Sequence, residues 1–353
     1  MRRTALLAMT AGLALLLALV LRHGPAGITA ALAVAGWSIL WVAAYHILPL
    51  AMDTFGWALL MPRGRGPGLG GLLVARWVAE SINTLLPAAQ VGGHVARARL
   101  VTGHWSHAPL EPAESGASVT VDVTVSVLTQ FAFALMGLLL TLPYLTDGGD
   151  RWRFWGGLAL GALLLAGFVL AQRAGMFTAG AKLLQGLAGG RRLSGLLGGA
   201  KAMDAHILAI YADRGRLAAS TGLRLLSWLT KSGESWLALH FLGVRASLWD
   251  ALVIEALSTA ATSAAFMIPG GLGVREGSIL LLGRLMGITP EVALALALIK
   301  RAREIILGLP GLAVWLWLEG RGWLGREPGT DKATQGHGQA AGGRDKLTAG
   351  RRD

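Results

Sequence analysis

A broken stretch between two apolar segments, residues 266–277 (FMIPGGLGVREG), constrains the fold more than any other part of the chain. It combines a helix-breaking proline with four glycines and an adjacent arginine and glutamate. In a bilayer, backbone that leaves helical geometry survives only where it is buried in protein or lines a wet cavity. The stretch therefore predicts the bend of a re-entrant hairpin or broken helix at a polar site. The alternative is a plain extramembrane turn between two helices.

The composition indicates that this stretch belongs to a membrane protein. The 353 residues are 54% hydrophobic and only 15% charged, and the mean hydropathy is +0.55. No cysteine is present, which excludes disulfides, thiol nucleophiles and cysteine-ligated metals. The net charge of +12 lies in loops between apolar runs, where basic residues set orientation and meet anionic lipids. We therefore expect a lipid partner and no nucleic acid.

The order of apolar runs predicts an all-α, polytopic helical membrane protein. The expected spans are 5–21, 28–48, 118–142, 154–171, 217–242 and 291–318, with a hairpin over 248–286. Pro49 and Asp53 are expected to end the second span and to leave a short interfacial piece over 52–61. We predict a transmembrane domain over 1–320 and a disordered cytoplasmic tail over 321–353.

Orientation follows from the basic loops. The intervals 62–67 and 172–216 are rich in arginine and lysine, which predicts that both lie in the cytoplasm. With the expected spans, this places both termini on the cytoplasmic side of the membrane.

A second stretch repeats the pattern of the first. Its polar, proline and glycine positions are Arg76, Glu80, Asn83, Pro87, Gln90, Gly92, Gly93 and Arg97. The first three recur at helical spacing and share one face. Two broken segments that enter from opposite sides predict an inverted repeat. Transporters built in this way bind their substrate at the repeat interface near the bilayer midplane.

Several ionisable residues lie within the expected spans. The last span carries Lys300, Arg301, Arg303 and Glu304 near its centre. Because lipid exposure costs about 2.5–3.5 kcal/mol for each charge, these side chains must pair or face a cavity. Glu255 lies on a serine- and threonine-rich face, and Lys231 and Glu234 lie near mid-span. Asp122 either lines a site or reaches water at the end of its helix.

Residues 80–87 (ESINTLLP), 90–93 (QVGG) and 97–99 (RAR), together with 268–276 (IPGGLGVRE), resemble the membrane region of lysylphosphatidylglycerol synthases and flippases. Within that superfamily the chain is most similar to the hopanoid-biosynthesis-associated membrane proteins, and the resemblance covers 2–319. It implies a bacterial inner-membrane protein that moves or handles a lipid. Two-domain members also carry a soluble aminoacyl-transferase domain, for which this sequence has no room, so we expect no lipid aminoacylation.

The resemblance also identifies the residues of this chain that correspond to the family's two proline- and glycine-containing motifs. They are Pro87, Gly92, Gly93 and Arg97 in the first stretch, and Pro269, Gly270, Gly271, Gly273, Arg275 and Glu276 in the second. No phosphate-binding P-loop or His-Glu-x-x-His zinc pair occurs in the sequence. His94, His104 and His107 lie close together without a carboxylate or cysteine partner. We therefore expect no metal or other cofactor.

These observations lead to a lipid transporter as the first hypothesis. Its basic side chains would hold a phosphate or polar headgroup, and its carboxylates would balance them when no lipid is bound. The predicted substrate-binding residues are Arg76, Glu80, Asn83, Gln90, Arg97, Glu255, Pro269, Gly270, Gly271, Gly273, Arg275, Glu276, Lys300, Arg301, Arg303 and Glu304. Phospholipids, hopanoids and hopanoid-biosynthesis proteins are the expected partners. The alternatives are a membrane-embedded enzyme acting on lipid headgroups and a scaffold for hopanoid enzymes.

Overall fold

The computed structural model describes residues 21, 25–86, 91–103, 110–141, 163, 166–167, 170, 172–175, 178–179, 194–265, 268 and 271–324. These residues form α-helices joined by turns, which confirms the predicted all-α class. The expected spans 5–21 and 154–171 lie almost wholly outside the described residues, as does the tail after 324.

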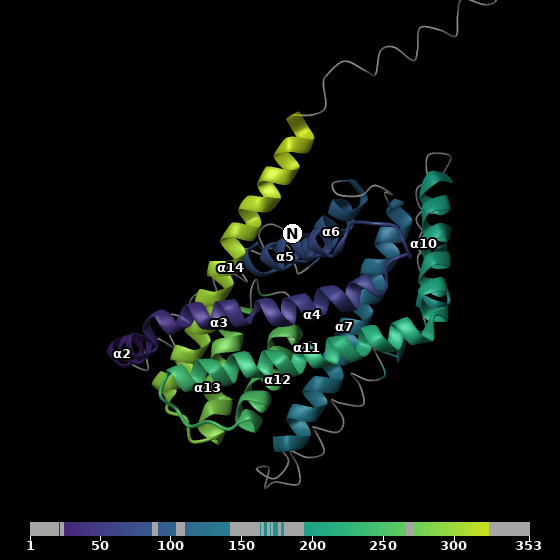
Figure 1. Cartoon of the computed structure of the whole chain (residues 1–353). Helices are drawn as coiled ribbons and strands as arrows, with labels where there is room; N and C mark the ends of the chain where they lie inside the picture. Colours follow the sequence, from purple (N-terminus) through teal and green to yellow (C-terminus); the bar gives the residue numbers. More distant parts are fainter. Residues whose placement is uncertain are drawn as a thin grey trace, which may run out of the picture. The chain divides into compact units, whose positions relative to one another are not determined.

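The helices of the described residues are labelled in chain order in Figure 1. They are α2 (Pro25–Ala35), the 3₁₀ helix η1 (Gly36–Ser38), α3 (Ile39–Tyr45), α4 (Ile47–Ala58), α5 (Leu69–Leu85), α6 (Gly92–Gly103), α7 (Pro112–Thr141), α10 (Ser194–Ala212), α11 (Arg214–Phe241), α12 (Leu248–Ala264), α13 (Val274–Leu285) and α14 (Pro290–Leu324). By contacts the chain divides into two units, Met1–Leu312 and Ala313–Asp353. Every contact described below lies in the first unit, and the domain boundary at 320 stays a prediction.

Two helical stretches among the described residues, Leu32–Ala58 and Pro112–Thr141, are long and apolar enough to cross a bilayer. The first stretch corrects the expectation that Pro49 and Asp53 end a span. The helix continues through both residues to Ala58. Pro49 is the third residue of α4, where a missing N–H removes no helical hydrogen bond. The expected helix end at Pro49 and Asp53 is therefore wrong, whereas the interfacial position of 52–61 stays a prediction.

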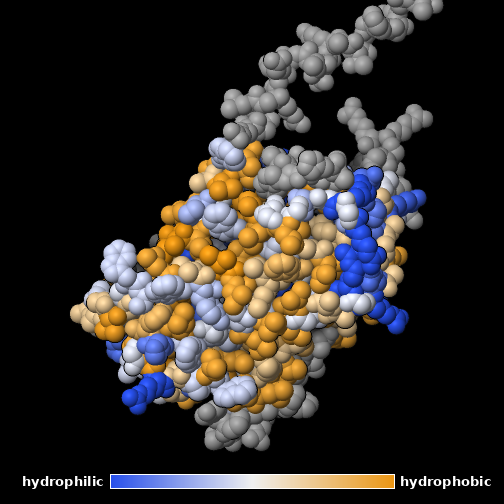
Figure 2. Space-filling model, viewed as in Figure 1, coloured by the Kyte–Doolittle hydropathy of each residue, from blue (hydrophilic) through white to orange (hydrophobic). Residues whose placement is uncertain are grey.

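Helix α11 has its polar face inside and its apolar face outside. Arg224 and Glu234 are buried, whereas Leu225, Leu226 and Leu229 are 37%, 47% and 42% exposed. A soluble protein would place these faces the other way. Figure 2 shows apolar side chains over most of one face, with hydrophilic ones gathered near α10. This arrangement fits a helix whose leucines meet lipid and whose charges meet protein.

The charged helices are held together by a small set of packing contacts. Helix α4 lies beside α11 (Figure 1), and α7 packs against α10, α11 and α12. Helix α5 packs against α4 and α6, and α12 packs against α13. The polar faces of α4, α5, α7 and α11 are thereby brought to a common interior.

Both predicted breaks coincide with helix ends. Helix α5 ends at Leu85 and α6 begins at Gly92, while α12 ends at Ala264 and α13 begins at Val274. Pro87, Gln90, Pro269 and Gly270 lie outside the described residues. Gly271 has a φ of +59°, a conformation that favours glycine. The entry of these segments into the bilayer and the inverted repeat stay predictions.

Gly93 permits the close approach of α6 to α5, so we expect Gly93→Ala to destabilise the protein. A Cβ at this position would lie 2.1 Å from the carbonyl oxygen of Ala79. Overpacking against backbone costs about 1–3 kcal/mol. Thermal unfolding of the detergent-solubilised protein measures this loss. Gly70→Ala is the control, because a Cβ at Gly70 meets nothing within 4 Å. Equal midpoints for the two variants would contradict the close approach.

Candidate functional site

Three arginines from three helices converge on one buried carboxylate. Arg76 Nη1 of α5 and Arg97 Nη1 of α6 donate to Asp122 Oδ2 of α7 at 3.1 and 2.7 Å. Arg224 Nη2 of α11 donates to Asp122 Oδ1 at 2.5 Å. Asp122 is 1% exposed, so it lines an interior site and does not reach water at a helix end.

A second aspartate extends this group toward α4. Asp53 Oδ1 lies 2.7 Å from Arg224 Nη1, and Asp53 Oδ2 lies 3.3 Å from Lys231 Nζ and 3.9 Å from Arg76 Nη2. Two cation–π contacts flank the ion pairs: Arg97 stacks on Trp57 at 4.7 Å, and Lys231 lies 4.1 Å from the Trp228 ring centroid. We call this group the Asp122 cluster; its members are Asp53, Arg76, Arg97, Asp122, Arg224 and Lys231.

A second group surrounds Glu234, deep in α11. His46 Nδ1 lies 2.7 Å from Glu234 Oε2, and His46 Nε2 lies 2.8 Å from Glu80 Oε1. Arg303 of α14 contacts the same two carboxylates, with Nε 3.2 Å from Glu234 Oε1 and Nη1 3.6 Å from Glu80 Oε1. A histidine and an arginine from different helices thus share two glutamates.

Lys300 joins this group to α12. Its Nζ donates to Glu255 Oε2 at 2.6 Å and to Ser235 Oγ at 3.0 Å, and it lies 3.8 Å from Glu234 Oε1. We call this group the Glu234 network; its members are His46, Glu80, Glu234, Ser235, Glu255, Lys300 and Arg303.

The third group lies where α13 meets α14. Arg275 pairs with Glu304, and Arg301 donates to Glu304 Oε2 and to Glu276 Oε1, both at 3.0 Å. The backbone N–H of Gly273 donates to Glu276 Oε2 at 2.7 Å, so this glutamate also caps the first turn of α13. We call Arg275, Glu276, Arg301 and Glu304 the Glu304 group.

The charges of the last two groups nearly cancel, which is what burial requires. A charge taken out of water is tolerated when an opposite charge and hydrogen bonds replace the solvent. Each of their four cations, Arg275, Lys300, Arg301 and Arg303, contacts at least one carboxylate. Lys300, Arg301, Arg303 and Glu304 of α14 are thus paired, as their position in an apolar span predicted.

The Glu234 network reaches the outside of the bundle at one place. A small pocket of about 20 Å³, enough for one water molecule, lies between α5 and α14. His46, Glu80, Arg303 and Glu304 line it, and the Glu80 side chain is 40% exposed. Polar groups in the interior are therefore reachable from the seam between these two helices.

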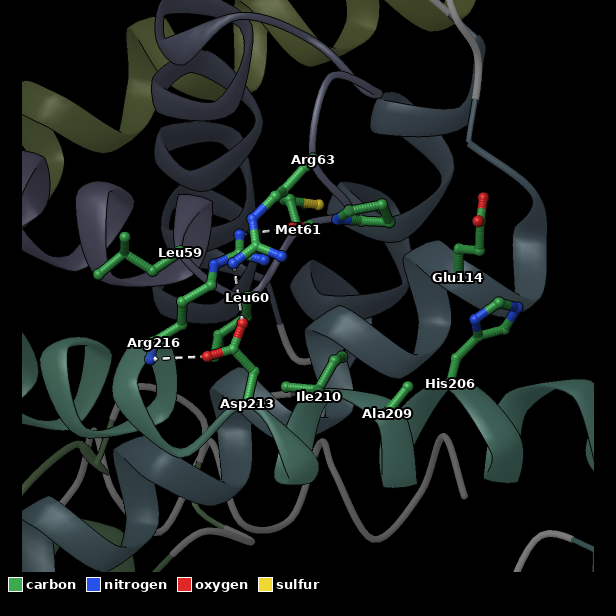
Figure 3. A pocket seen from close by; sticks show the side chains of 11 residues that line it. Leu59, Leu60, Met61, Arg63, Glu114, His206, Ala209, Ile210, Asp213 and Arg216 are labelled. Carbon is green, nitrogen blue, oxygen red and sulfur yellow. Dashed lines mark hydrogen bonds and ion pairs between the residues drawn. The ribbon is translucent and has the colours of Figure 1, made fainter.

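A larger pocket of about 310 Å³ lies at the end of α4, next to α10 and the start of α11 (Figure 3). Its wall is mostly apolar, and its charged groups are already occupied. Arg63 pairs with Asp213 at 3.2 Å, and Arg216 Nη2 donates to the carbonyl oxygen of Met61 at 2.7 Å. Among the described residues that line this pocket, positive and negative charges balance, so the pocket does not call for a charged ligand.

Most of the predicted substrate-binding residues lie in these three groups. Arg76 and Arg97 belong to the Asp122 cluster, Asn83 accepts a hydrogen bond from the Gly93 N–H, and Gly271 and Gly273 precede α13. The remaining described members, Glu80, Glu255, Arg275, Glu276, Lys300, Arg301, Arg303 and Glu304, lie in the other two groups. Gln90, Pro269 and Gly270 lie outside the described residues.

Seven residues of these groups were not among the predicted set: His46, Asp53, Asp122, Arg224, Lys231, Glu234 and Ser235. Four of them carried a usable signal, since each is a charged residue in a long apolar helix. Asp53 was misread as a helix end, and His46 gave no signal beyond a single histidine in an apolar run. Among the described residues, no three His, Asp or Glu side chains are arranged to hold a metal ion.

Comparison with known proteins identifies the family. The sequence model of the lysylphosphatidylglycerol synthase TM region matches residues 5–311. No protein of curated function and no solved structure is significantly similar to the chain. The match covers most of the chain and includes every residue of the three charged groups. The protein therefore belongs to the lysylphosphatidylglycerol synthase TM region family, and it is an all-helical membrane protein.

Proposed function

We propose that this protein is a lipid transporter of the bacterial inner membrane, which moves a polar or anionic headgroup through the interior of the helical bundle. The observation that carries the proposal is the opening at Glu80, where a buried charged network meets the outside between α5 and α14. A lipid headgroup needs a polar path, while its acyl chains stay in the bilayer. A polar interior that opens sideways meets both needs.

Helices α5 and α14 lie close together along the seam between them. Trp77 Nε1 donates to the carbonyl oxygen of Leu307 at 2.8 Å. Gly308 and Gly311 face Leu85 and Ser81 so closely that an added Cβ would lie 2.6 and 2.1 Å from them. Small residues let the two helix backbones approach closely along this seam. Separation of this seam would expose Arg303 and Glu80 to an entering headgroup.

We expect Arg303→Gln to lower the rate of lipid movement about tenfold or more, since charge-assisted hydrogen bonds contribute roughly 1.5–3 kcal/mol. The measurement is the loss of a fluorescent phospholipid from the outer leaflet of reconstituted vesicles. Arg284→Gln is the matched control, because Arg284 lies exposed in the last turn of α13.

Arg303→Lys separates folding from transport. It keeps the positive charge that Glu80 and Glu234 require but removes the planar fork. A folded Arg303→Lys variant should transport more slowly than wild type. Transport at the wild-type rate by both Arg303 variants would refute the proposed path.

The orientation of the protein is part of this proposal. Arg63 and Arg216 line the same pocket, so the basic loop after α4 and the basic start of α11 lie at one end of the bundle. Basic segments that share an end agree with a common cytoplasmic side. We extend this to cytoplasmic N- and C-termini. Protection of single introduced cysteines from an impermeant reagent in intact cells tests the assignment.

An enzyme or a scaffold would give different results. An enzyme acting on headgroups would change the mass of lipids incubated with the pure protein, whereas a transporter would not. The link to hopanoids rests on the resemblance of the first broken stretch. Native mass spectrometry of the gently extracted protein would identify the bound lipid. A scaffold would co-purify with hopanoid enzymes and tolerate loss of the buried charges.

A further inference from the structure

The Asp122 cluster differs from the other two groups in its charge balance. Four cationic side chains, Arg76, Arg97, Arg224 and Lys231, face two carboxylates, Asp53 and Asp122. Among the described residues, this leaves an excess of two positive charges inside the bundle. Lys231 also interacts electrostatically with Glu80. If its charge is counted against that of Glu80, the cluster still holds an excess of one positive charge. Buried excess charge is costly, so its retention points to a ligand of opposite sign.

The hydrogen-bond geometry shows the same deficit of acceptors. Three guanidinium groups carry about fifteen N–H donors, whereas two carboxylates offer about eight lone-pair positions. Arg97 is 2% exposed, yet its Nε has no hydrogen-bond partner among the described residues. Asp53 Oδ1 also lacks an aligned hydrogen bond, although it lies 2.7 Å from Arg224 Nη1, so the deficit lies in the total number of acceptors and not at every atom. The buried Nδ1 of His94 also has no partner there.

The four cations of the cluster differ in how deeply they are buried. The side chains of Arg76 and Lys231 are 12% and 18% exposed, whereas those of Arg97 and Arg224 are almost fully buried. The two outer cations would therefore meet an entering anion first, and the inner arginines would hold it.

We propose that the Asp122 cluster is a binding site for a phosphate group. Guanidinium groups bind phosphate through paired N–H donors, and a phosphate supplies both the negative charge and the several acceptor oxygens that the cluster lacks. The phosphate of a lipid headgroup and free inorganic phosphate share this chemistry. The inference rests on the proposed transport function only in naming the headgroup that would be carried. Phosphate binding itself is measurable without transport.

His94→Glu tests the site by supplying the missing charge from within. His94 lies close enough to Arg97, Arg76 and Arg224, and also to Asp122, to interact electrostatically with each, so a glutamate there would meet three cations and one carboxylate. A glutamate there would compete with phosphate, and it would also raise the thermal unfolding midpoint of the ligand-free protein. A variant that is more stable yet binds less separates loss of the site from loss of the fold. His94→Gln is the neutral control and should bind as wild type does.

The assay is the thermal shift of the full chain in a neutral detergent, with three probes added in turn. They are short-chain phosphatidylglycerol, inorganic phosphate and short-chain diacylglycerol, which lacks the phosphate. We expect phosphatidylglycerol to stabilise wild type and His94→Gln, and its affinity for His94→Glu to fall about tenfold or more. If His94→Glu fails to fold, Arg97→Gln, which lowers the excess by one charge, should also bind more weakly.

The outcomes assign the source of the phosphate. Stabilisation by phosphatidylglycerol alone supports a lipid headgroup, and stabilisation by inorganic phosphate as well supports a general phosphate site. Three results would overturn the inference: no thermal shift with either phosphatidylglycerol or inorganic phosphate, a shift with diacylglycerol equal to that with phosphatidylglycerol, or an unchanged affinity of His94→Glu for phosphatidylglycerol. Transport without phosphate binding would leave the proposed function standing, and binding without transport would leave only the site.

Discussion

Asp122→Asn is expected to lower the stability of the protein by about 3–5 kcal/mol, the usual cost of removing one partner from a buried ion-pair group. Asp122 is the carboxylate on which Arg76, Arg97 and Arg224 converge. An asparagine keeps the shape but leaves Asp53 as the one carboxylate of the Asp122 cluster. Denaturant or thermal unfolding of the detergent-solubilised protein measures the loss, and yield from the membrane should fall with it.

The control for this change is Glu111→Gln. Glu111 lies exposed just before α7, the helix that carries Asp122, so its neutralisation should leave the unfolding midpoint within a small margin of wild type. If Asp122→Asn were as stable as Glu111→Gln, the convergence of three arginines on this carboxylate would be disproved.

Lys300→Met is expected to have the second large effect, again about 3–5 kcal/mol. Its Nζ contacts Glu255 at 2.6 Å, and without it the buried Glu255 keeps only hydroxyl partners within hydrogen-bond distance. Glu255→Gln should cost less, because Lys300 still lies 3.8 Å from Glu234. The double variant should recover part of the loss, with a coupling energy of about 1–3 kcal/mol.

A double-mutant cycle in unfolding free energy measures this coupling. Lys201→Met serves as the control, since Lys201 is exposed on α10. Strictly additive losses for Lys300→Met and Glu255→Gln would show that the two side chains do not form the pair described here. Equal losses for Lys201→Met and Lys300→Met would show that the burial of Lys300 has no energetic consequence.

Much of the fold was predictable because membrane helices carry a strong local signal. A run of apolar residues about twenty long predicts a helix, and the interruption at Pro87 and at Pro269 marks where helical geometry ends. The charges of α14 could also be interpreted from sequence, since a bilayer does not solvate them. Asp53 shows the limit of this reading. Proline and aspartate near one another suggested a helix end, but Pro49 lies in the first turn and Asp53 faces a cation.

The order of residues alone is enough to establish that this chain is a helical membrane protein whose intramembrane charges must find partners. The reason is local: transfer of apolar side chains and of unpaired charges into lipid has a known sign for each residue. Only the tertiary structure decided which partners they find. Arg76 and Glu80 share a helix face, yet one contacts Asp122 and the other His46, because packing of α4, α7 and α11 sets those distances. Charge balance depends on which side chains meet in three dimensions. The excess of positive charge in the Asp122 cluster therefore cannot be seen in any single segment of the sequence.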